Sequence, residues 1–481
     1  MPTSRPLSIC WLRRDLRLHD HAPLALATAE SQAVAVVFIL DRVILDALEN
    51  SRDRRLTFIH RSLCELDSKL RAHGSMLIVR TGDPAEEIPQ LAQELGAKCV
   101  YTGKDYEPYA RTRDAKVAQS LFESGIDFVA VKDSVVREGG EVLSQERNPL
   151  RVYTPYRKSW ERSFEPERDA AEHQVTLAHL VQAKEIPEQY KTSLPSLNDL
   201  GFEEVDLWLS PGEDAALEKL GQFAPQMHRY RELRDFPAAH ATSGLSVHLR
   251  FGTISVRKMV RLALSQTSEG AETWLREIIW RDFYQDILFH FPDVVERPFQ
   301  RIYDDLEYPG EQDHFLAWCE GRTGYPLVDA AMRCFNATGW MHNRLRMVVA
   351  SFLTKDLLID YRQGEAYFAA GLLDFDLASN NGGWQWASSV GADPQPYFRI
   401  FNPILQSVKF DPEGKFIREW CPELSHLEGE ALHFPARASE FELLTANVEL
   451  GKNYPKPIVD HATQKERAIS LLAVAKSTGS E

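Results

Sequence analysis

The sequence lacks the features that would mark a metalloprotein, a disulfide-rich protein or a membrane protein. Its six cysteines are scattered, with no Cys-x-x-Cys pair and no zinc-ligand spacing, as in proteins of a reducing compartment. No run of 18 apolar residues occurs, and Arg13, Arg14, Asp15 and Arg17 interrupt the first apolar stretch. We therefore expect a cytoplasmic protein with no metal and no membrane segment.

Two further features of the sequence limit the classes of function that it can have. No G-x-G-x-x-G follows the first strand candidate, which argues against a dinucleotide fingerprint there. Basic residues are outnumbered, with 55 Lys and Arg against 70 Asp and Glu and a formal net charge of −15. This charge excludes a protein that coats nucleic acid indiscriminately, although a local basic face remains compatible with it.

The 481 residues exceed one ordinary domain, and the pattern changes along the chain. Up to residue 133, short apolar runs alternate with polar, helix-forming segments (53–72, 84–95 and 108–124), which predicts a doubly wound, Rossmann-like parallel sheet. The run "AVAVVFIL" is apolar throughout, as in a parallel strand buried on both faces. The predicted strands cover residues 8–12, 33–40, 76–81, 98–102 and 127–133.

The remaining chain divides into a connector and a helical domain. Residues 134–207 are rich in Glu, Pro and Ser, and this composition predicts an interdomain linker on the surface. From 208 to 481 the strand pattern disappears and helical periodicity dominates. The clearest predicted helices cover residues 273–289, 326–336 and 342–359. We therefore expect an α/β domain (1–133) and a large all-α domain (208–481).

Tryptophan and basic residues concentrate in the helical part. Eight of the ten tryptophans lie there, and residues 225–261 carry seven Arg or Lys against two acidic residues. Such a surface suits nucleic acid, because cations hold phosphates and indoles stack on bases. A solvated helix face beside core aromatics is the alternative interpretation.

Three short segments carry candidate chemistry. "TSGLS" (242–246) offers hydroxyls and a glycine before a helix, which fits either an anion site or a simple N-cap. Glu277 and Trp280 share a helix face, where a carboxylate beside an indole suits a base edge or an ordinary surface. Arg344 and Arg346 point in different directions, towards two anions or two internal salt bridges.

The motifs, taken together, resemble the photolyase/cryptochrome family of blue-light flavoproteins. They are "WLRRDLRLHDHAPL", "TSGLS", "EIIWRDFYQDIL", "GRTGYPLVDAAMR", "GWMHNRLRM", "NNGGWQWASS" and "PYFRIFNP", in the order of that family and over nearly the whole chain. The resemblance implies an α/β antenna domain, a linker and a helical domain that binds FAD. It also implies that reduced, light-excited FAD donates an electron to a flipped-out pyrimidine dimer in UV-damaged DNA, which splits and returns it.

The resemblance also assigns roles to residues. Asn380 would face the flavin and support its reduced form, Glu277 would hydrogen-bond the pyrimidine edge, and Trp384 would pass electrons. The remaining cofactor contacts are expected from Tyr230, Thr242, Ser243, Gly244, Leu245, Ser246, Trp274, Arg346, Asp374, Phe375 and Asp376, with Arg346 paired to Asp374. The remaining DNA and lesion contacts are expected from Arg234, Trp280, Asn343, Arg344, Met347, Trp386 and Gln406.

Within that family, the sequence is most similar to class I photolyases of cyclobutane pyrimidine dimers. The (6-4) photolyases usually carry paired histidines where this chain has His342-Asn343, and plant-type cryptochromes tend to carry valine at Met347. The chain ends soon after Lys456, without a long signalling tail. The alternatives are a cryptochrome-like signalling photoreceptor, a (6-4) photolyase or a light-insensitive flavin redox enzyme. We expect a monomer.

Two positions depart from the family pattern. Trp384 would begin a chain of three tryptophans to the surface, but the second and third positions are Tyr361 and Tyr308. Tyrosine is harder to oxidise unless its proton can leave, so we expect slow photoreduction or a path through Trp318 or another indole. In the antenna domain, "FILD" (38–41) and "DYEPYARTRD" (105–114), with Tyr109-Ala110 at the Asn-Glu positions of folate binders, favour an 8-hydroxy-5-deazaflavin over methenyltetrahydrofolate.

Overall fold

The computed structural model describes residues 5–191 and 193–478, so the first four and last three residues of the predicted domains lie outside it. The chain forms two compact units, each with its own core. The first unit comprises Met1–Leu150, Pro155–His228 and Ser243–His290. The second comprises Arg151–Thr154, Arg229–Thr242 and Phe291–Glu481.

The first unit contains a five-stranded, fully parallel sheet with strand order β3-β2-β1-β4-β5. The predicted doubly wound α/β fold is confirmed, and each strand overlaps the segment predicted for it. The strands are β1 (Arg5–Leu12), β2 (Ser31–Asp41), β3 (Leu77–Gly82), β4 (Cys99–Gly103) and β5 (Asp127–Val131).

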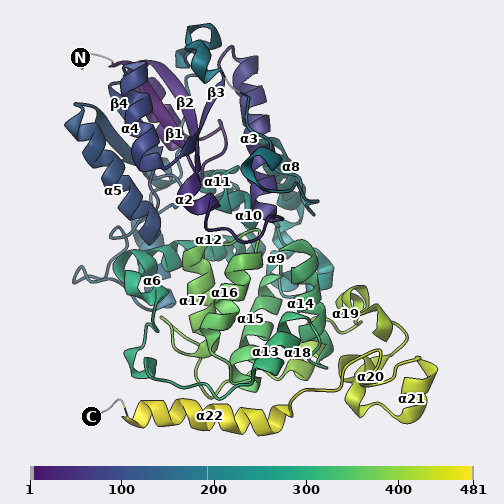
Figure 1. The fold of residues 1–481 in the computed structure, drawn as a ribbon. Helices are drawn as coiled ribbons and strands as arrows, with labels where there is room; N and C mark the ends of the chain where they lie inside the picture. The colour runs from purple at the N-terminus through teal and green to yellow at the C-terminus, as the bar shows by residue number, and fades with distance from the viewer. Residues whose placement is uncertain (1–4, 192, 479–481) are drawn as a thin grey trace. The chain divides into compact units, whose positions relative to one another are not determined.

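Helices cover both faces of this sheet. On one face, Ile9 and Trp11 of β1 pack with Leu91 of α4 (Pro84–Leu95) and Leu121 of α5 (Pro108–Glu123), and Figure 1 shows both helices beside the strands. Helix α1 (Ala22–Glu30) contacts β1, β2 and β4 but contributes no residue to that cluster, so it covers the other face. Burial on both faces explains the uninterrupted apolar run of β2.

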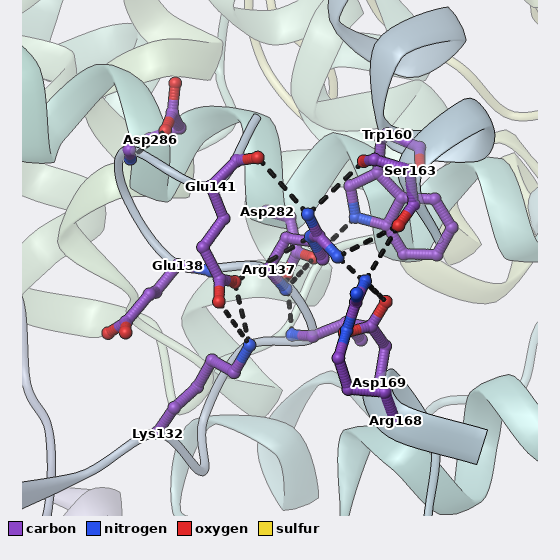
Figure 2. A network of polar contacts seen from close by, with 12 residues as sticks. Lys132, Arg137, Glu138, Glu141, Trp160, Ser163, Arg168, Asp169, Asp282 and Asp286 are labelled. Carbon is purple, nitrogen blue, oxygen red and sulfur yellow. Dashed lines mark hydrogen bonds and ion pairs between the residues drawn. The ribbon is translucent and has the colours of Figure 1, made fainter. Parts of the chain in front are cut away.

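The segment predicted as a connector begins as an ordered layer on α12 (Glu269–His290). Figure 2 shows the buried carboxylate of Asp282, which accepts the backbone N–H groups of Val136 at 3.3 Å and Arg137 at 3.0 Å. It also accepts the indole N–H of Trp160 at 3.0 Å, while Arg137 pairs with Asp169 at 2.8 Å. These bonds fix the start of the connector to the helix that carries Glu277 and Trp280.

The second unit is helical, as predicted. Neighbouring helices pack around a core that includes Trp318, Leu345, Phe352 and Trp384, and Figure 1 shows α14 to α17 side by side. These four are α14 (Pro326–Thr338), α15 (Asn343–Ser351), α16 (Tyr361–Gly371) and α17 (Leu377–Ser388). The unit also contains α9 (Tyr230–Leu233), α13 (Gln312–Cys319), α18 (Pro403–Phe410) and α22 (His461–Thr478).

The α-helix predicted over 342–359 is not continuous, and the prediction is wrong after residue 351. Helix α15 ends at Ser351, and a π-helical turn, η9 (Phe352–Asp356), follows it. In this turn the buried Lys355 donates hydrogen bonds to the carbonyl of Ser388 at 3.0 Å and the hydroxyl of Ser389 at 2.9 Å. Lys355 therefore satisfies the C-terminal end of α17, a tertiary contact that local periodicity does not encode.

Candidate functional site

Helix α17 begins at a side-chain cap and carries the Asn-Asn-Gly-Gly-Trp motif. The carboxylate of Asp376, at the N-cap, accepts the backbone N–H of Ser379 at 3.0 Å and its hydroxyl at 2.9 Å. This cap compensates for two glycines in the helix interior, each of which costs about 0.5–1 kcal/mol relative to alanine. Asn380 and Trp384 follow one turn apart on the same side of the helix.

Just before α17, Asp374 is held by Arg346 of α15. One guanidinium nitrogen of Arg346 contacts both carboxylate oxygens, at 2.8 and 3.0 Å, and its Nε donates to the carbonyl of Met341 at 2.8 Å. Asp374 is buried, so the pair orients a charged group inside the second unit. Between Asp374 and Asp376, Phe375 is half-buried against the main core.

Asn380 and Asn381 are buried and bind the neighbouring helix α16. The Asn380 amide donates to the backbone carbonyl of Glu365 at 3.1 Å. The Asn381 amide donates to the Glu365 carboxylate at 3.0 Å and to the carbonyl of Val294 at 2.9 Å. Burial raises the pKa of Glu365 to about 7, which places a titratable acid beside Asn380.

Trp384 and Trp386 have different environments. The indole of Trp384 is 3% exposed and lies 5.1 Å from the ring of Phe368 and 6.1 Å from that of Trp318, centroid to centroid. Trp386 is only partly buried at the edge of the same core. Residues two apart on a helix point to different sides, which accounts for the contrast.

The two tyrosines predicted behind Trp384 do not continue its ring contacts. Tyr361 is buried at the start of α16, and Tyr308 is partly buried before α13. Among the described residues, the ring contacts of Trp384 are with Trp318 and Phe368 and not with either tyrosine. Helix α16 comes closest to Trp384 at Gly364, where an added Cβ would lie 2.2 Å from the indole Cη2.

Helix α15 carries three of the predicted lesion residues and is capped at its N-terminus by the side chain of His342. The Nδ1 of His342 accepts the backbone N–H of Arg344 at 3.2 Å, and burial lowers the pKa of His342 to about 4, so its ring is neutral. The Arg344 guanidinium pairs with Asp235 at 3.0 Å and lies 4.4 Å from the ring centre of Phe410. Asn343 is exposed, and Arg344 has its charge partly matched within the unit.

Four other predicted residues also belong to the second unit. Met347 lies one turn after Asn343 on α15 and is half-buried. Arg234 lies 5.4 Å over the ring of the buried Tyr230. Gln406 of α18 has a buried Oε1 with no hydrogen-bond partner among the described residues, so its carbonyl is free to accept a bond.

Helix α12 of the first unit carries Trp274, Glu277 and Trp280. Trp274 is buried and packs against Phe223 at 5.1 Å. Glu277 and Trp280 are half-buried, and the Trp280 indole contacts the ring of the next-turn residue Tyr284 at 5.5 Å. The carboxylate and the indole therefore lie on a helix that is held before them by the packing of Trp274 and after them by the hydrogen bonds of Asp282.

The loop 243–246 is not a simple side-chain N-cap. Leu245 occupies the N-cap position of α10 (Ser246–Arg250) and makes no side-chain capping bond. Gly244 has a φ of +61°, and an added Cβ there would lie 2.6 Å from Cε of Lys219. Lys219 was not expected from the sequence. It lies 5.3 Å from the ring centre of Trp208 and supplies a cation beside the loop hydroxyls.

In the α/β unit, the two segments predicted to bind an antenna meet at the carboxyl ends of the strands. Tyr109 of α5 donates its hydroxyl hydrogen to Asp41 at the end of β2, at 2.7 Å. Nearby, Arg13 and Arg113 lie 4.7 and 5.0 Å from the ring centre of Trp11. A small, open pocket lies where β1 and β4 end, lined in part by Arg14, Lys104 and Asp105. Strand order reverses between these strands, the usual ligand position in open α/β sheets.

The described part of the chain offers neither a clustered metal site nor a membrane-spanning helix. Residues 5–191 and 193–478 contain no group of three or more His, Cys, Asp or Glu placed to hold a metal ion. In the same residues, no helix has both the length and the apolar character needed to cross a membrane.

Comparison with known proteins gives two family matches that together cover most of the chain. Residues 8–175 match the model described as DNA photolyase, and residues 274–473 match the FAD binding domain of DNA photolyase. The deoxyribodipyrimidine photo-lyase of Synechococcus sp. is 39% identical, over 98% of this chain and 97% of the relative.

Solved structures give the same result. A bacterial class III photolyase from Agrobacterium tumefaciens has a TM-score of 0.89 at 36% identity and covers 99% of both chains. A cryptochrome from Synechocystis sp. has a TM-score of 0.86 at 28% identity, over 98% of this chain and 100% of the other.

Proposed function

The chain belongs to the DNA photolyase family, as the sequence motifs predicted, and we propose that it splits cyclobutane pyrimidine dimers in DNA under blue or near-ultraviolet light. This is the activity of a deoxyribodipyrimidine photo-lyase. The observation that carries the proposal is that Asn380 and Trp384 lie one turn apart on α17, while Arg346 fixes Asp374 just before this helix. Bound FAD, reduced and excited by light, would supply the electron that opens the cyclobutane ring.

The residues around α17 fit a flavin. Gly383 lies one turn after Asn380 inside the helix, and a Cβ added there would meet nothing within 4 Å. A glycine in a helix interior is destabilising, and the open space over Gly383 leaves room for the close approach of a flat ligand. The buried amide of Asn380 and the Arg346–Asp374 pair supply polar groups beside this space.

On the cofactor side, the chain's own residues bind and orient. Asn380 presents an amide fixed by Glu365, and we assign it to the flavin ring edge. The hydroxyls of the loop 242–246, with Lys219 beside Gly244, suit the phosphates and the ribitol. The other proposed contacts are Tyr230, Trp274, Phe375 and Asp376.

On the substrate side, the chain receives a flipped-out lesion. Photolyases are among the enzymes that extrude their target nucleotides, and a dimer stacks poorly, which makes extrusion cheap. We assign Glu277 to the pyrimidine edge and the indoles of Trp280 and Trp386 to packing against the dimer. Arg234 and Arg344 are assigned to phosphates, because guanidinium groups bind them in a fixed geometry. Asn343, Met347 and Gln406 complete the proposed set.

The decisive experiment measures repair of defined lesions. The purified protein, with its flavin reduced, is illuminated with DNA that carries one cyclobutane dimer or one (6-4) product. We expect light-dependent loss of the cyclobutane dimer only. Repair of the (6-4) product alone would overturn the substrate assignment, and a flavoprotein that repairs neither lesion would support the signalling alternative. A protein with no flavin absorbance would contradict the FAD assignment.

We also propose that the α/β unit holds a light-harvesting chromophore of the 8-hydroxy-5-deazaflavin type. The contact between Asp41 and Tyr109 joins the two segments that favour it. The test mixes the purified protein with the deazaflavin or with methenyltetrahydrofolate and measures energy transfer to the flavin. Transfer from the deazaflavin, weakened in Tyr109→Ala, is expected; transfer from the folate alone would contradict the proposal.

The domain roles remain proposals of the same kind. We assign residues 1–133 to the antenna domain, 134–207 to the linker and 208–481 to the FAD-binding catalytic domain. We further propose a cytoplasmic monomer. Sedimentation of the flavin-loaded protein at the mass of two chains would overturn the proposal that it is a monomer.

A further inference from the structure

Lys219 is a half-buried cation without an anionic partner. It belongs to α8 (Glu213–Phe223) of the first unit, and its ammonium group lies 5.3 Å from the ring centre of Trp208. Within the described part of the chain, no carboxylate pairs with Lys219 and no acceptor takes a hydrogen bond from it. Burial lowers the pKa of its amino group. An ordinary surface lysine keeps its ammonium group in water, so the burial of an unpaired Lys219 indicates a site for an anion.

Gly244 leaves the space in which Lys219 lies against the loop 243–246. A Cβ added to Gly244 would lie 2.6 Å from Cε of Lys219 and 3.2 Å from its Nζ. The end of the lysine side chain therefore occupies the space that a side chain of residue 244 would fill. The φ of Gly244 is +61°, a left-handed conformation that residues with a side chain rarely adopt. A glycine at this position thus allows a residue of α8 to supply the loop with a positive charge.

The loop beside Lys219 offers hydroxyl groups and no negative charge. Ser243 is half-buried and Ser246 is exposed. The ring of His248, on α10, is neutral, because burial and then the charge of Lys219 lower its pKa to about 3. One cation beside two hydroxyl groups suits a phosphate, whose oxygens accept hydrogen bonds from both kinds of donor.

Two sources of phosphate share the chemistry that this site would recognise. The loop 243–246 belongs to the segment assigned above to the flavin phosphates, and the pyrophosphate of FAD brings two negative charges to the single charge of Lys219. A phosphate of the DNA backbone brings one. The greater charge and the neighbouring loop favour FAD, and the two sources are separated by the experiments below.

We propose that Lys219 is a cationic ligand of the FAD pyrophosphate and binds it beside Gly244, an inference that rests on the FAD binding required by the proposed function. The hydroxyl groups of the loop orient the phosphates, and Lys219 neutralises part of their charge. Because the attraction is between opposite charges that are only half-buried, salt weakens it. The affinity for FAD therefore falls as the salt concentration rises, and this dependence requires a cation at residue 219.

The experiment measures the dissociation constant of FAD for the full chain at low and high salt. Lys219→Met keeps an apolar stem and removes the charge, so it should weaken FAD binding by roughly 10- to 100-fold at low salt and by less at high salt. Lys219→Arg retains a cation and should recover part of the affinity. Lys409→Met is the matched control, since Lys409 also lies over an aromatic ring, 5.1 Å from the centre of that of Phe410, and should leave FAD affinity unchanged.

Thermal melting separates binding of FAD from a purely structural role of Lys219. Without flavin, Lys219→Met should melt at the temperature of the parent or above it, because the variant lacks a desolvated charge that has no anion. With FAD in excess, the variant should gain less in melting temperature than the parent gains. A variant that melts lower without flavin, and that gains as much from FAD as the parent does, would overturn the proposal.

Binding of dimer-containing duplex DNA to the flavin-loaded protein identifies the source of the phosphate. Lys219→Met should bind this DNA with the affinity and the salt dependence of the parent. Weaker DNA binding together with unchanged FAD affinity would place a DNA phosphate at Lys219 and overturn the proposal. Failure of the flavin-loaded parent to repair cyclobutane dimers would count against the proposed function alone, because the FAD affinities of the parent and the variants would still measure the contribution of Lys219.

Discussion

At the scale of single residues, Asp286 on α12 is a buried carboxyl group that lacks a full set of partners. Its Oδ1 accepts the N–H of Gly140 at 3.4 Å and lies 3.5 Å from Nε2 of His290, while its Oδ2 has no partner in the described chain. Burial, and to a lesser extent the charge of Asp282, raises the pKa of Asp286 to about 7. Figure 2 shows Asp286 at the edge of the polar network that surrounds Arg137.

This raised pKa makes folding stability depend on pH. The unfolded chain loses the Asp286 proton near its ordinary pKa, whereas the folded protein keeps it until about 7. Protonated Asp286 therefore makes its full contribution to the free energy of unfolding below about pH 4. This contribution falls as the pH rises and is lost once the pH passes 7. Asp286→Asn should raise the free energy of unfolding by about 1–3 kcal/mol above pH 7, with no gain near pH 4. Urea denaturation across that pH range measures both.

Asp282 provides the matched comparison for Asp286. Its two oxygens accept three N–H groups, from Val136, Arg137 and Trp160, so an amide in either orientation would turn an NH₂ towards a donor. Asp282→Asn should therefore destabilise the protein by about 1–3 kcal/mol at neutral pH. Equal effects of the two substitutions would contradict the assignment of partners to these neighbouring carboxyl groups.

At the scale of elements, the glycines of α16 and α17 play opposite parts. Gly383→Ala should stabilise the flavin-free protein by about 0.5–1 kcal/mol, because helical alanine is favoured and nothing lies within 4 Å of the new methyl group. The same change should weaken flavin binding, since the methyl group would occupy space assigned to the ring. Thermal melting of flavin-free protein and flavin titration measure the two effects.

Gly364→Ala is the contrasting variant. Its Cβ would lie 2.2 Å from the Trp384 indole and 2.5 Å from Leu353, so α16 would have to move. Overpacking of this kind costs about 1–3 kcal/mol, and it should lower stability with or without flavin. Tighter flavin binding in Gly383→Ala would contradict the flavin position proposed over α17.

The sequence allowed the elements to be predicted where the pattern is local. Apolar runs that alternate with polar, helix-forming segments gave the five strands, and helical periodicity gave the helices over residues 273–289 and 326–336. The contacts between elements were not predictable in the same way. Glu365 beside Asn380, Trp318 beside Trp384 and Lys219 beside Gly244 each join segments distant in the chain, and no periodicity relates them. The roles assigned to the site residues remain predictions.

At the scale of the whole molecule, the proposed function requires a chain with a net charge of −15 to bind a polyanion. Phosphate contacts release counterions, so affinity falls with salt in proportion to the number of phosphates neutralised. Arg344, one of the few assigned phosphate ligands, is already paired with Asp235 at 3.0 Å. We therefore expect few net phosphate contacts and weak binding to undamaged DNA, with selectivity provided by the extruded lesion.

Salt titration of DNA binding tests this balance of charges. The logarithm of the association constant for dimer-containing duplex should fall against the logarithm of salt concentration with a slope of only about −2 to −4. Arg344→Ala should make the slope shallower by at most about one unit, because Asp235 already neutralises part of the charge that Arg344 brings to a phosphate. Lys452→Ala removes an exposed lysine paired with Glu449 and should leave the slope unchanged. A steep slope that is insensitive to Arg344 would instead locate the DNA contacts on basic residues outside the proposed set.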